Sequence, residues 1–344
     1  MASVASQEIR NNRATCGCWK TYSQHRARIG EEISRAAFAS RAASNQAELT
    51  FCALGAGNLN DIDLGQLLSL FGQIHLVDID RSAVENGIER QAAQSADVKR
   101  AIAQKRIVVH APFDVTSVAH LLCGDESTAD SKEELSQRVV RALSSQSARS
   151  DIATNVDAAH GGLEATMDVV VSLSMVSQLI RQVQEAFRGN SSQWHPIADL
   201  IVDAHLKLMN RLLNPGGSAL LVTDVIGATT GAQELLNLTS QTSGEVEQTS
   251  QQLIEQGKHF PFLTPREVVI RLSTLNRVFH VSTSPFWLWD ISQNVRYMCS
   301  CVHWLKTTEA SDDGAQQANV PLSYRINQFM QRTGVALTSL GHPP

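Results

Sequence analysis

Short apolar runs alternate with helical stretches through the middle of the chain. The runs have the length and the β-branched content of strands buried on both faces, and they lie at 49–54, 74–77, 106–110, 168–173 and 219–223. Helical spacing of apolar residues predicts helices between them, at 64–71, 81–94, 175–187 and 196–213. Two later runs, 277–282 and 295–304, are predicted to form an antiparallel pair. This order predicts an α/β fold, namely a doubly wound, mostly parallel seven-stranded sheet with helices on both faces and an antiparallel C-terminal strand pair.

The polar parts of the chain predict its organisation into segments. Residues 1–47 are polar and helical in pattern and are expected to form an N-terminal lid or cap on a domain that spans 48–307. Stretches rich in Ser, Gln, Ala, Asp and Thr near 123–165 and 231–258 are expected to be polar insertions, the first with a helix at about 133–143. Residues 308–344 are expected to form a C-terminal tail.

Composition narrows the class of protein. Hydrophobic residues make up 43% of the 344, as in globular chains. The 29 Lys and Arg against 34 Asp and Glu give a net charge of −5 with no long basic run, which disfavours nucleic acid as a partner. No apolar run approaches the roughly 18 residues of a membrane span, and the first 20 residues have no signal-peptide pattern. We expect a cytoplasmic protein with no membrane contact; the sequence predicts no oligomeric state.

Two Cys-x-Cys pairs occur among the six cysteines. Cys16 with Cys18 and Cys299 with Cys301 have the residue types of a four-thiolate zinc site. The second pair lies on one face of a predicted strand, however, where small apolar core residues are expected. We favour the core interpretation and expect no metal.

Glycines and acids follow the first three predicted strands. Gly55 and Gly57 come directly after the first strand, and Asp78 directly follows the second, 21 residues after Gly57. Asp114 follows the third strand. Ligands of doubly wound sheets bind at these carboxyl ends, where glycines allow close approach and an acid at this spacing accepts hydrogen bonds from a ribose. The alternative is that the acids cap helices, and Asp80 before 81–94 is a good candidate for a cap.

In the order Gly55-Ala56-Gly57, 76–80, Asp114, 168–174 and the Leu-Asn-Pro-Gly-Gly run at 213–217, these motifs resemble those of class I S-adenosylmethionine-dependent methyltransferases over about residues 49–225. The resemblance implies S-adenosylmethionine as cofactor and S-adenosylhomocysteine as product. It implies that Asp78 binds the ribose hydroxyls and that Asp114 accepts from the adenine amine. The cofactor-binding residues it implies are Gly55, Ala56, Gly57, Asn58, Asp78, Ile79, Phe113, Asp114, Val115 and Ser172.

The chain departs from the family pattern at two positions. Ala53 stands where these proteins usually carry an acid, and Leu59 stands where they carry a third small residue. We expect contacts to the methionine end of the cofactor from Asn58, Asn60 and Asp61 instead. Asp61 as a cap of the next helix is an equal alternative.

The residues of the acceptor pocket are the least predictable part. Methyl transfer needs alignment and exclusion of water, and a base only where the acceptor carries a proton that must leave. The segment 172–175 is not the Asn/Asp-Pro-Pro-Tyr/Phe of amino methylation on bases or glutamine, so we expect a small-molecule O or N acceptor. The candidates for the pocket are Tyr22, Ser174, Gln178 and Asp224.

Three alternatives stay open at this stage. Trp19 and Tyr22 either close over the cofactor or pack the N-terminal helix onto the core. The aromatic residues at 286–289 are either a wall of the acceptor pocket or core, and core is favoured. A protein that binds S-adenosylmethionine without catalysing methyl transfer is the alternative function. A nicotinamide dehydrogenase fits poorly because it would have a third glycine at Asn60.

Overall fold

The computed structural model describes residues 4–44, 48–115, 132–148, 167–187, 191–227, 234–238, 243–292 and 295–307. Its strands are β1 (Leu49–Leu54), β2 (Phe71–Val77), β3 (Ile107–His110), β4 (Met167–Leu173), β5 (Leu213–Gly227), β6 (Val278–Thr283), β7 (Trp287–Ser292) and β8 (Val295–Lys306). Its helices are α1 (Val4–Thr15), α2 (Ser23–Ser44), α3 (Leu64–Leu70), α4 (Arg81–Gln94), α5 (Ala96–Ala103), α7 (Lys132–Ala148), α9 (Met175–Ala186), α10 (Ser191–Leu212), α11 (Glu234–Asn237), α12 (Ser243–Glu255) and α13 (Pro265–Leu272).

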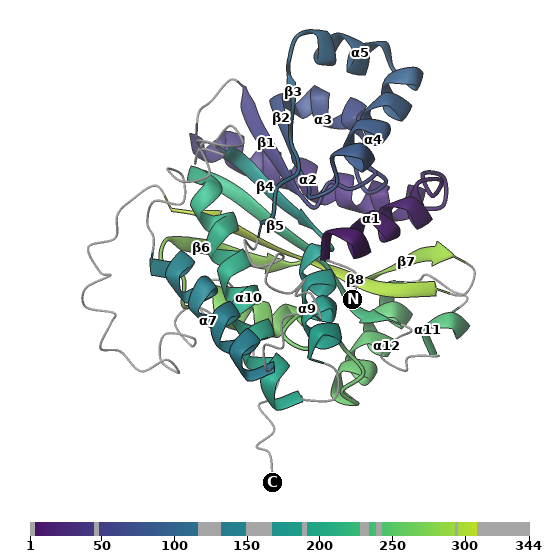
Figure 1. The fold of residues 1–344 in the computed structure, drawn as a ribbon. Helices are drawn as coiled ribbons and strands as arrows, with labels where there is room; N and C mark the ends of the chain where they lie inside the picture. Colours follow the sequence, from purple (N-terminus) through teal and green to yellow (C-terminus); the bar gives the residue numbers. More distant parts are fainter. Residues whose placement is uncertain are drawn as a thin grey trace.

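The strands form one sheet in the order β3-β2-β1-β4-β5-β8-β6, with β7 paired to β8 beside this path (Figure 1). Strands β1 to β5 are parallel, and β8 runs antiparallel to β5, β6 and β7. The predicted fold class is therefore confirmed, with β7 as an eighth strand. The strand order reverses between β1 and β4, and ligands bind at such a switch point in doubly wound sheets.

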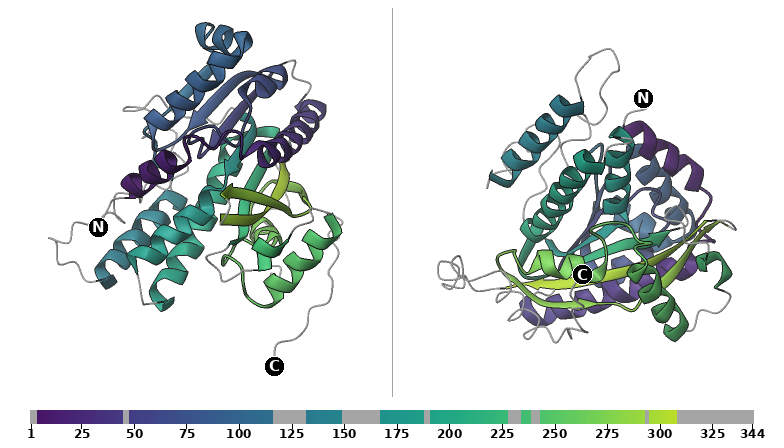
Figure 2. Two further views of the ribbon diagram at one scale, coloured as in Figure 1. Left: turned by 90° about the vertical axis from the view of Figure 1, so that its right-hand side faces the viewer. Right: turned by 90° about the horizontal axis from the view of Figure 1, so that it is seen from below.

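Two hydrophobic cores lie on the two faces of the sheet, and Figure 2 shows helices on both sides of it. Along β1, Phe51 and Ala53 point into the core under α2, α3 and α4, whereas Cys52 and Leu54 point into the core under α9, α10 and α13. This alternation is the consequence of the two-residue period of a strand. Because both faces are covered, the parallel strands are apolar throughout, which is why the sequence predicted them.

Some segments differ from their predicted form. The Asn-Pro-Gly-Gly run at 214–217 is the beginning of β5 and not a turn, and Gly216 accommodates the change with a φ of 82°. In the stretch 231–258, α11 and α12 are not merely polar, since Leu235, Val246 and Leu253 are buried against β5, β7 and β8. Of the predicted insertion at 123–165 only 132–148 is described, where the expected helix is α7. The tail at 308–344 lies outside the described residues.

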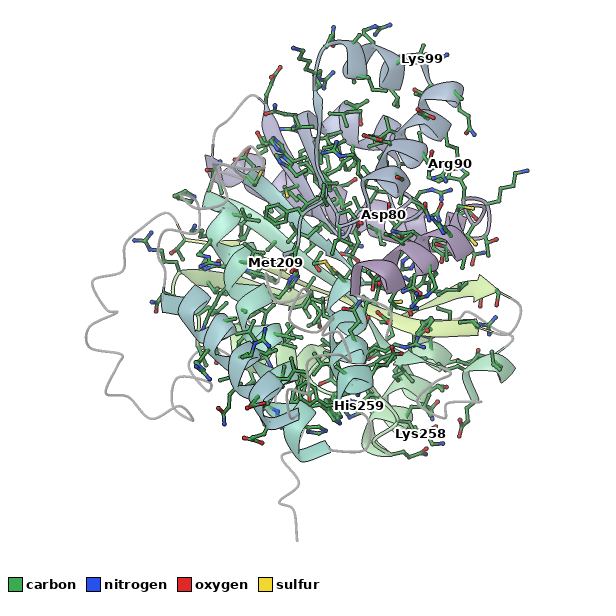
Figure 3. The ribbon with its side chains drawn as sticks, viewed as in Figure 1. Asp80, Arg90, Lys99, Met209, Lys258 and His259 are labelled. Atoms are coloured by element: carbon green, nitrogen blue, oxygen red, sulfur yellow. The ribbon has the colours of Figure 1, made fainter. Side chains whose placement is uncertain are left out.

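The N-terminal segment crosses the carboxyl ends of the strands. Helix α1 lies there between α4 and the β7–β8 hairpin (Figure 1). After α1 in the chain, the Trp19 ring packs against two arginines. Its centroid is 3.4 Å from the guanidinium carbon of Arg26 and 4.9 Å from that of Arg90. Arg90 and Asp80 mark α4, the helix beside α1, in Figure 3. Trp19 therefore packs the segment onto the domain.

Cys299 and Cys301 are buried in β8, as favoured from the sequence, while Cys16 is exposed. Among the described residues, no three or more His, Cys, Asp and Glu side chains are arranged to hold a metal ion. No described helix has the length and apolar character needed to cross a membrane.

Candidate functional site

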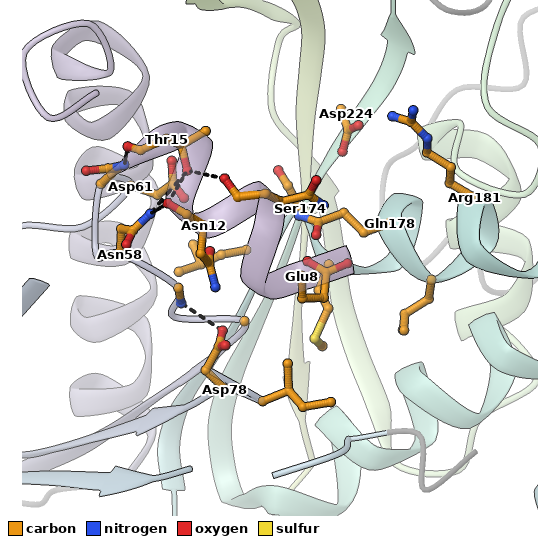
Figure 4. Close-up of a pocket in the computed structure, with 18 of the residues that line it drawn as sticks. Glu8, Asn12, Thr15, Asn58, Asp61, Asp78, Ser174, Gln178, Arg181 and Asp224 are labelled. Atoms are coloured by element: carbon orange, nitrogen blue, oxygen red, sulfur yellow. Dashed lines mark hydrogen bonds between the residues drawn. The ribbon is translucent and has the colours of Figure 1, made fainter. Parts of the chain in front are cut away.

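A cavity of about 290 Å³ lies at the carboxyl ends of the parallel strands, under helix α1 (Figure 4). Most of the residues proposed from the sequence line it. They are Tyr22, Gly55, Gly57, Asn58, Asp78, Ile79, Phe113, Asp114, Val115, Ser174, Gln178 and Asp224. Residues more than 200 positions apart in the chain are thus brought to one site.

The turn after β1 begins with two glycines in the left-handed region, at φ 77° for Gly55 and 46° for Gly57. Glycine adopts this conformation without a steric penalty. The turn is fixed because the N–H groups of Gly55 and Ala56 donate to the carbonyl oxygen of Val77, at 2.9 and 3.1 Å. Backbone at this turn is therefore exposed to the cavity in a fixed conformation.

A glycine of α4 packs closely against this turn, where Leu59 replaces the third small residue of the family pattern. A Cβ on Gly87 of α4 would lie 2.5 Å from the carbonyl oxygen of Asn58. Arg90, one turn further, donates to the same oxygen at 2.7 Å. The third small position of the family pattern thus has a counterpart in α4, which sequence spacing alone did not reveal.

Asp78 is held by backbone groups at the end of β2. One carboxylate oxygen accepts from the N–H of Gly57 at 2.8 Å (Figure 4), and the other accepts from the N–H of Asp80 at 2.8 Å. Burial raises the pKa of Asp78, while these two hydrogen bonds act to lower it. A carboxylate has about four lone-pair sites, so this one keeps capacity for hydroxyl donors. Asp80 caps α4 by accepting from the N–H of Ala83 at 3.2 Å, as predicted.

The segment after β3 turns toward the same edge. The N–H of Phe113 donates to the carbonyl oxygen of Asp78 at 2.9 Å, which joins the ends of β2 and β3. Ile79, Phe113 and Val115 give the cavity an apolar part. The carboxyl group of Asp114, between Phe113 and Val115 in the sequence, also lines it. This combination suits a flat ring with an amine at its edge.

Two of the proposed cofactor residues do not line the cavity. Ala56 is buried at 2% exposure beneath the turn. Ser172 is fully buried within β4, and its hydroxyl lies 2.9 Å from Nε2 of His205 on α10. Side chains alternate along a strand, so Ser172 points into the helix layer. Ser174, two residues on, begins the connection to α9 and lines the cavity.

Helix α1 contributes cavity residues that sequence patterns did not single out. They are Glu8, Asn11, Asn12, Ala14 and Thr15. Their helix is polar all round, so nothing in its periodicity marks the face that lines the cavity. Other lining residues outside the prediction are Leu173, Met175, Leu179, Arg181, Gln182, Ile291 and Tyr297. Trp289, which the sequence left open between wall and core, also lines the cavity.

Side-chain amides fix α1 over the turn. The amide nitrogen of Asn58 donates to the carbonyl oxygen of Asn12 at 2.6 Å and to the hydroxyl of Thr15 at 3.1 Å. The amide nitrogen of Asn60 donates to the carbonyl oxygen of Thr15 at 2.8 Å. These two asparagines, expected at the methionine end of the cofactor, thus tie the end of the helix to the glycine turn.

The beginning of α1 is held over α9. The amide nitrogen of Gln182 donates to a carboxyl oxygen of Glu8 at 2.5 Å. Burial, and next the charge of Asp78, raise the pKa of Glu8 to about 7. At neutral pH Glu8 is therefore about half protonated, which reduces the repulsion between these two acids.

Asp61 is a cavity residue and not a helix cap, because Asp63 caps α3. Its carboxyl oxygen lies 3.5 Å from Nε2 of His25, and Nδ1 of His25 accepts from the indole N–H of Trp287 at 2.9 Å. Burial lowers the pKa of His25 to about 3 and raises that of Asp61 to about 7, so the histidine is neutral and the pair is not a salt bridge. Nε2 consequently carries the proton. At 3.5 Å it makes no hydrogen bond, and Oδ1 of Asp61 has no hydrogen-bond partner within the described part of the chain.

Asp224 closes the cavity from β5. It accepts a hydrogen bond of 2.5 Å from the hydroxyl of Ser177 on α9. Burial raises the pKa of Asp224 to about 6, against the effect of this hydrogen bond. At neutral pH the Asp224 side chain is therefore mostly ionised although it is buried from solvent.

Comparisons with known proteins add the following. No family model and no sequence of a characterised protein matches the chain. Among solved structures, the N-methyltransferase NodS from Bradyrhizobium japonicum WM9 is similar over 83% of this chain and 98% of that one, at 11% identity and a TM-score of 0.37. Magnesium protoporphyrin IX methyltransferase from Synechocystis PCC 6803, with bound S-adenosylhomocysteine, is similar over 84% and 92%, at 10% identity and a TM-score of 0.37.

These likenesses are remote, so the fold is judged on the strand order and on the place of the cavity. The order β3-β2-β1-β4-β5, continued by an antiparallel β8 and then β6, is that of a doubly wound, mostly parallel sheet with an antiparallel C-terminal strand pair, as predicted. The cavity lies at the switch point beside the glycine turn and Asp78. In both respects the structure agrees with the fold that the resemblance to class I S-adenosylmethionine-dependent methyltransferases implies.

Proposed function

We propose that the protein is an S-adenosylmethionine-dependent methyltransferase that acts on an O or N acceptor of a small molecule. The observation that carries the proposal is the position of Asp78. Its carboxylate is fixed by the N–H of Gly57 at the end of β2, inside the cavity, and retains acceptor capacity. A ribose with two free hydroxyls is the ligand part that such a carboxylate suits.

The remaining residues fit the other parts of the cofactor. Ile79, Phe113 and Val115 would hold the adenine ring, and Asp114 would accept from its amine. Gly55 and Gly57 would allow the methionine part to approach the backbone. Asp61 has an unpaired carboxyl oxygen at the cavity and would receive the methionine ammonium. When bound, the cofactor supplies an activated sulfonium methyl group.

The side chains of this protein would then orient the acceptor and exclude water. Ser174 and Gln178, next to and in α9, line the cavity together with Asp224 of β5. Helix α1, fixed by Asn58 and Asn60, covers the cavity from outside. Cover by a polar helix favours a small acceptor over a nucleic acid, as does the net charge of −5.

Thermal unfolding with S-adenosylmethionine, S-adenosylhomocysteine and, as a control, NAD tests the proposal. A ligand at 100 times its dissociation constant should stabilise the protein by about 2.7 kcal/mol. We expect a raised midpoint with both sulfur compounds and none with NAD. Asp78→Asn should lose most of the shift, whereas Asp97→Asn, on the exposed face of α5, should retain it.

Either of two results would redirect the proposal. The absence of any shift with the sulfur compounds would refute it. A shift without methyl transfer to a broad acceptor panel would favour the alternative, a protein that binds the cofactor but does not catalyse. The departure at Ala53, fully buried in β1 where an acid is usual, is the specific reason to keep that alternative.

A further inference from the structure

Three aromatic side chains form one wall of the cavity. Tyr22, Trp289 and Tyr297 all line it. The ring centroids of Tyr22 and Trp289 are 5.2 Å apart at 86°, and those of Trp289 and Tyr297 are 5.7 Å apart at 40°. The three rings therefore present differently oriented faces and edges over a short distance, as in sites that hold a cation against aromatic faces.

The central ring of this wall is fixed from behind. His25 is stacked on Trp289 with centroids 4.3 Å apart and planes at 10°, and His25 itself accepts from Trp287. The indole N–H of Trp289 is buried and has no hydrogen-bond partner among the described residues. In a simple core such a group costs free energy. An oxygen of a molecule in the cavity would satisfy it.

The charge of the cavity is strongly one-sided. Its described lining holds five carboxyl groups and one cationic side chain; these are Glu8, Asp61, Asp78, Asp114, Asp224 and Arg181. The proposed cofactor accounts for Asp61, Asp78 and Asp114. Arg181 is 58% exposed and lies 3.4 Å from Glu185, so solvent screens much of its charge. Glu8, whose pKa burial raises to about 7, carries only part of a charge at neutral pH, so Asp224 is the carboxylate left for a second ligand.

Asp224 is a carboxyl group near Tyr297 of the aromatic wall, and Asp61, assigned above to the cofactor, is one near Tyr22. The charge of Asp224 raises the pKa of the Tyr297 phenol, second to the effect of burial. Figure 4 shows Asp224 and Asp78 at opposite ends of the labelled group. Asp224 is thus separate from the proposed ribose site, and its place in β5 just beyond the pairing with β4 suits the acceptor side.

We infer that the methyl acceptor is an aliphatic amine, bound as an ammonium between Asp224 and the rings of Tyr22, Trp289 and Tyr297; this inference rests on the proposed function. The ammonium loses one proton to the Asp224 carboxylate, which frees a nitrogen lone pair. The nitrogen then forms a bond to the methyl carbon while the carbon–sulfur bond breaks and leaves its electron pair on sulfur. The products are a methylated ammonium and a neutral thioether.

A matched pair of ligands tests the binding part without catalysis. Choline cannot be methylated further, and 3,3-dimethyl-1-butanol has nearly its shape without the charge. Titration calorimetry with S-adenosylhomocysteine present should give at least about tenfold tighter binding for choline, as a desolvated cation–π site provides. Equal binding of the two compounds, with S-adenosylhomocysteine bound normally, would overturn the inference and leave the proposed function standing.

Variants assign the effect to these residues. Tyr297→Leu and Asp224→Asn should each weaken choline binding about tenfold, while Tyr297→Phe, which keeps the ring, and Asp97→Asn should not. All four should bind S-adenosylhomocysteine as the unchanged protein does, which shows that they are folded. Choline affinity unaffected by the first two variants would place the cation elsewhere and overturn the inference.

Methyl transfer completes the test. Primary and secondary alkylamines and amino alcohols should accept the methyl group, and the matched alcohols and ethers should not. Transfer only to the oxygen compounds would overturn the inference. If S-adenosylhomocysteine does not bind at all, the proposed function fails. A titration of the protein with choline alone, without S-adenosylhomocysteine, then decides whether the aromatic wall binds a cation.

Discussion

Replacement of Gly87 by alanine should destabilise the fold and displace the glycine turn after β1. The added Cβ would lie 2.5 Å from the carbonyl oxygen and 2.8 Å from the carbonyl carbon of Asn58, and 2.9 Å from Cγ of Leu59. Two of these atoms are backbone and cannot rotate away, and Arg90 holds the carbonyl oxygen in place. Overpacking of this kind costs about 1–3 kcal/mol. Alanine gains about 1 kcal/mol over glycine in a helix, so we expect a net loss of up to about 2 kcal/mol.

Urea denaturation and calorimetry with S-adenosylhomocysteine measure the two effects. Each kcal/mol of lost stability should lower the thermal midpoint by about 2–4 °C. Displacement of the turn should weaken the binding of S-adenosylhomocysteine by at least the same free energy. Gly244→Ala is the matched control, because a Cβ there meets nothing within 4 Å. It should be neutral or stabilising by about 0.4–1 kcal/mol. A Gly87→Ala protein as stable as Gly244→Ala would refute the close-packing argument.

Three further outcomes follow from the site. Burial raises the pKa of Asp61 from 3.8 to about 7. Between these pH values the group stays protonated in the folded protein and ionises in the unfolded chain, so stability should fall as the pH rises. Urea denaturation should show that Asp61→Asn removes up to about 1.4 kcal/mol per pH unit of this slope. Asn60→Ala removes the hydrogen bond to Thr15, and faster amide exchange confined to α1 should result; unchanged exchange there would contradict its anchoring role. Ser172→Ala leaves Nε2 of His205 without its partner, which should cost about 1–3 kcal/mol in stability with no change in S-adenosylhomocysteine affinity; a weakened ligand would return Ser172 to the site.

The sheet could be predicted because each strand carries its own signal. Strands covered on both faces are apolar at every position, and the run Asp168–Leu173 differs from β4 as found only by its first residue. Local sequence signals are equally clear at Thr264, which forms a full capping box with Glu267 at the beginning of α13. Strand β7 was less readable because its two tryptophans serve equally well as core and as cavity wall.

It could also be predicted that the residues proposed to bind the cofactor lie together, since most of them directly follow strands. The acceptor side of the cavity could not be predicted, because it is assembled by contacts between distant segments. Glu8 reaches the cavity only because Asn58 and Asn60 fix α1 above the turn, and Tyr297 only because β8 runs antiparallel to β5. Neither position is set by local spacing. Ser172 shows the converse, where a residue in the right motif is turned away by the alternation of its strand.

The two departures from the family pattern have a common structural explanation. Ala53 is fully buried between Leu76 and Val171, its partners in β2 and β4, so an acid there would lie in a tightly packed part of the sheet. Asp61 brings a carboxyl group to the cavity from the other side of the glycine turn, with one oxygen lacking a partner among the described residues. Gly87 likewise supplies from α4 the space that Leu59 takes. We infer that the binding functions moved to neighbouring elements and were not lost. The Asp61→Asn variant decides this point, because a site that has lost its acid would bind S-adenosylhomocysteine equally well with and without the Asp61 carboxyl group.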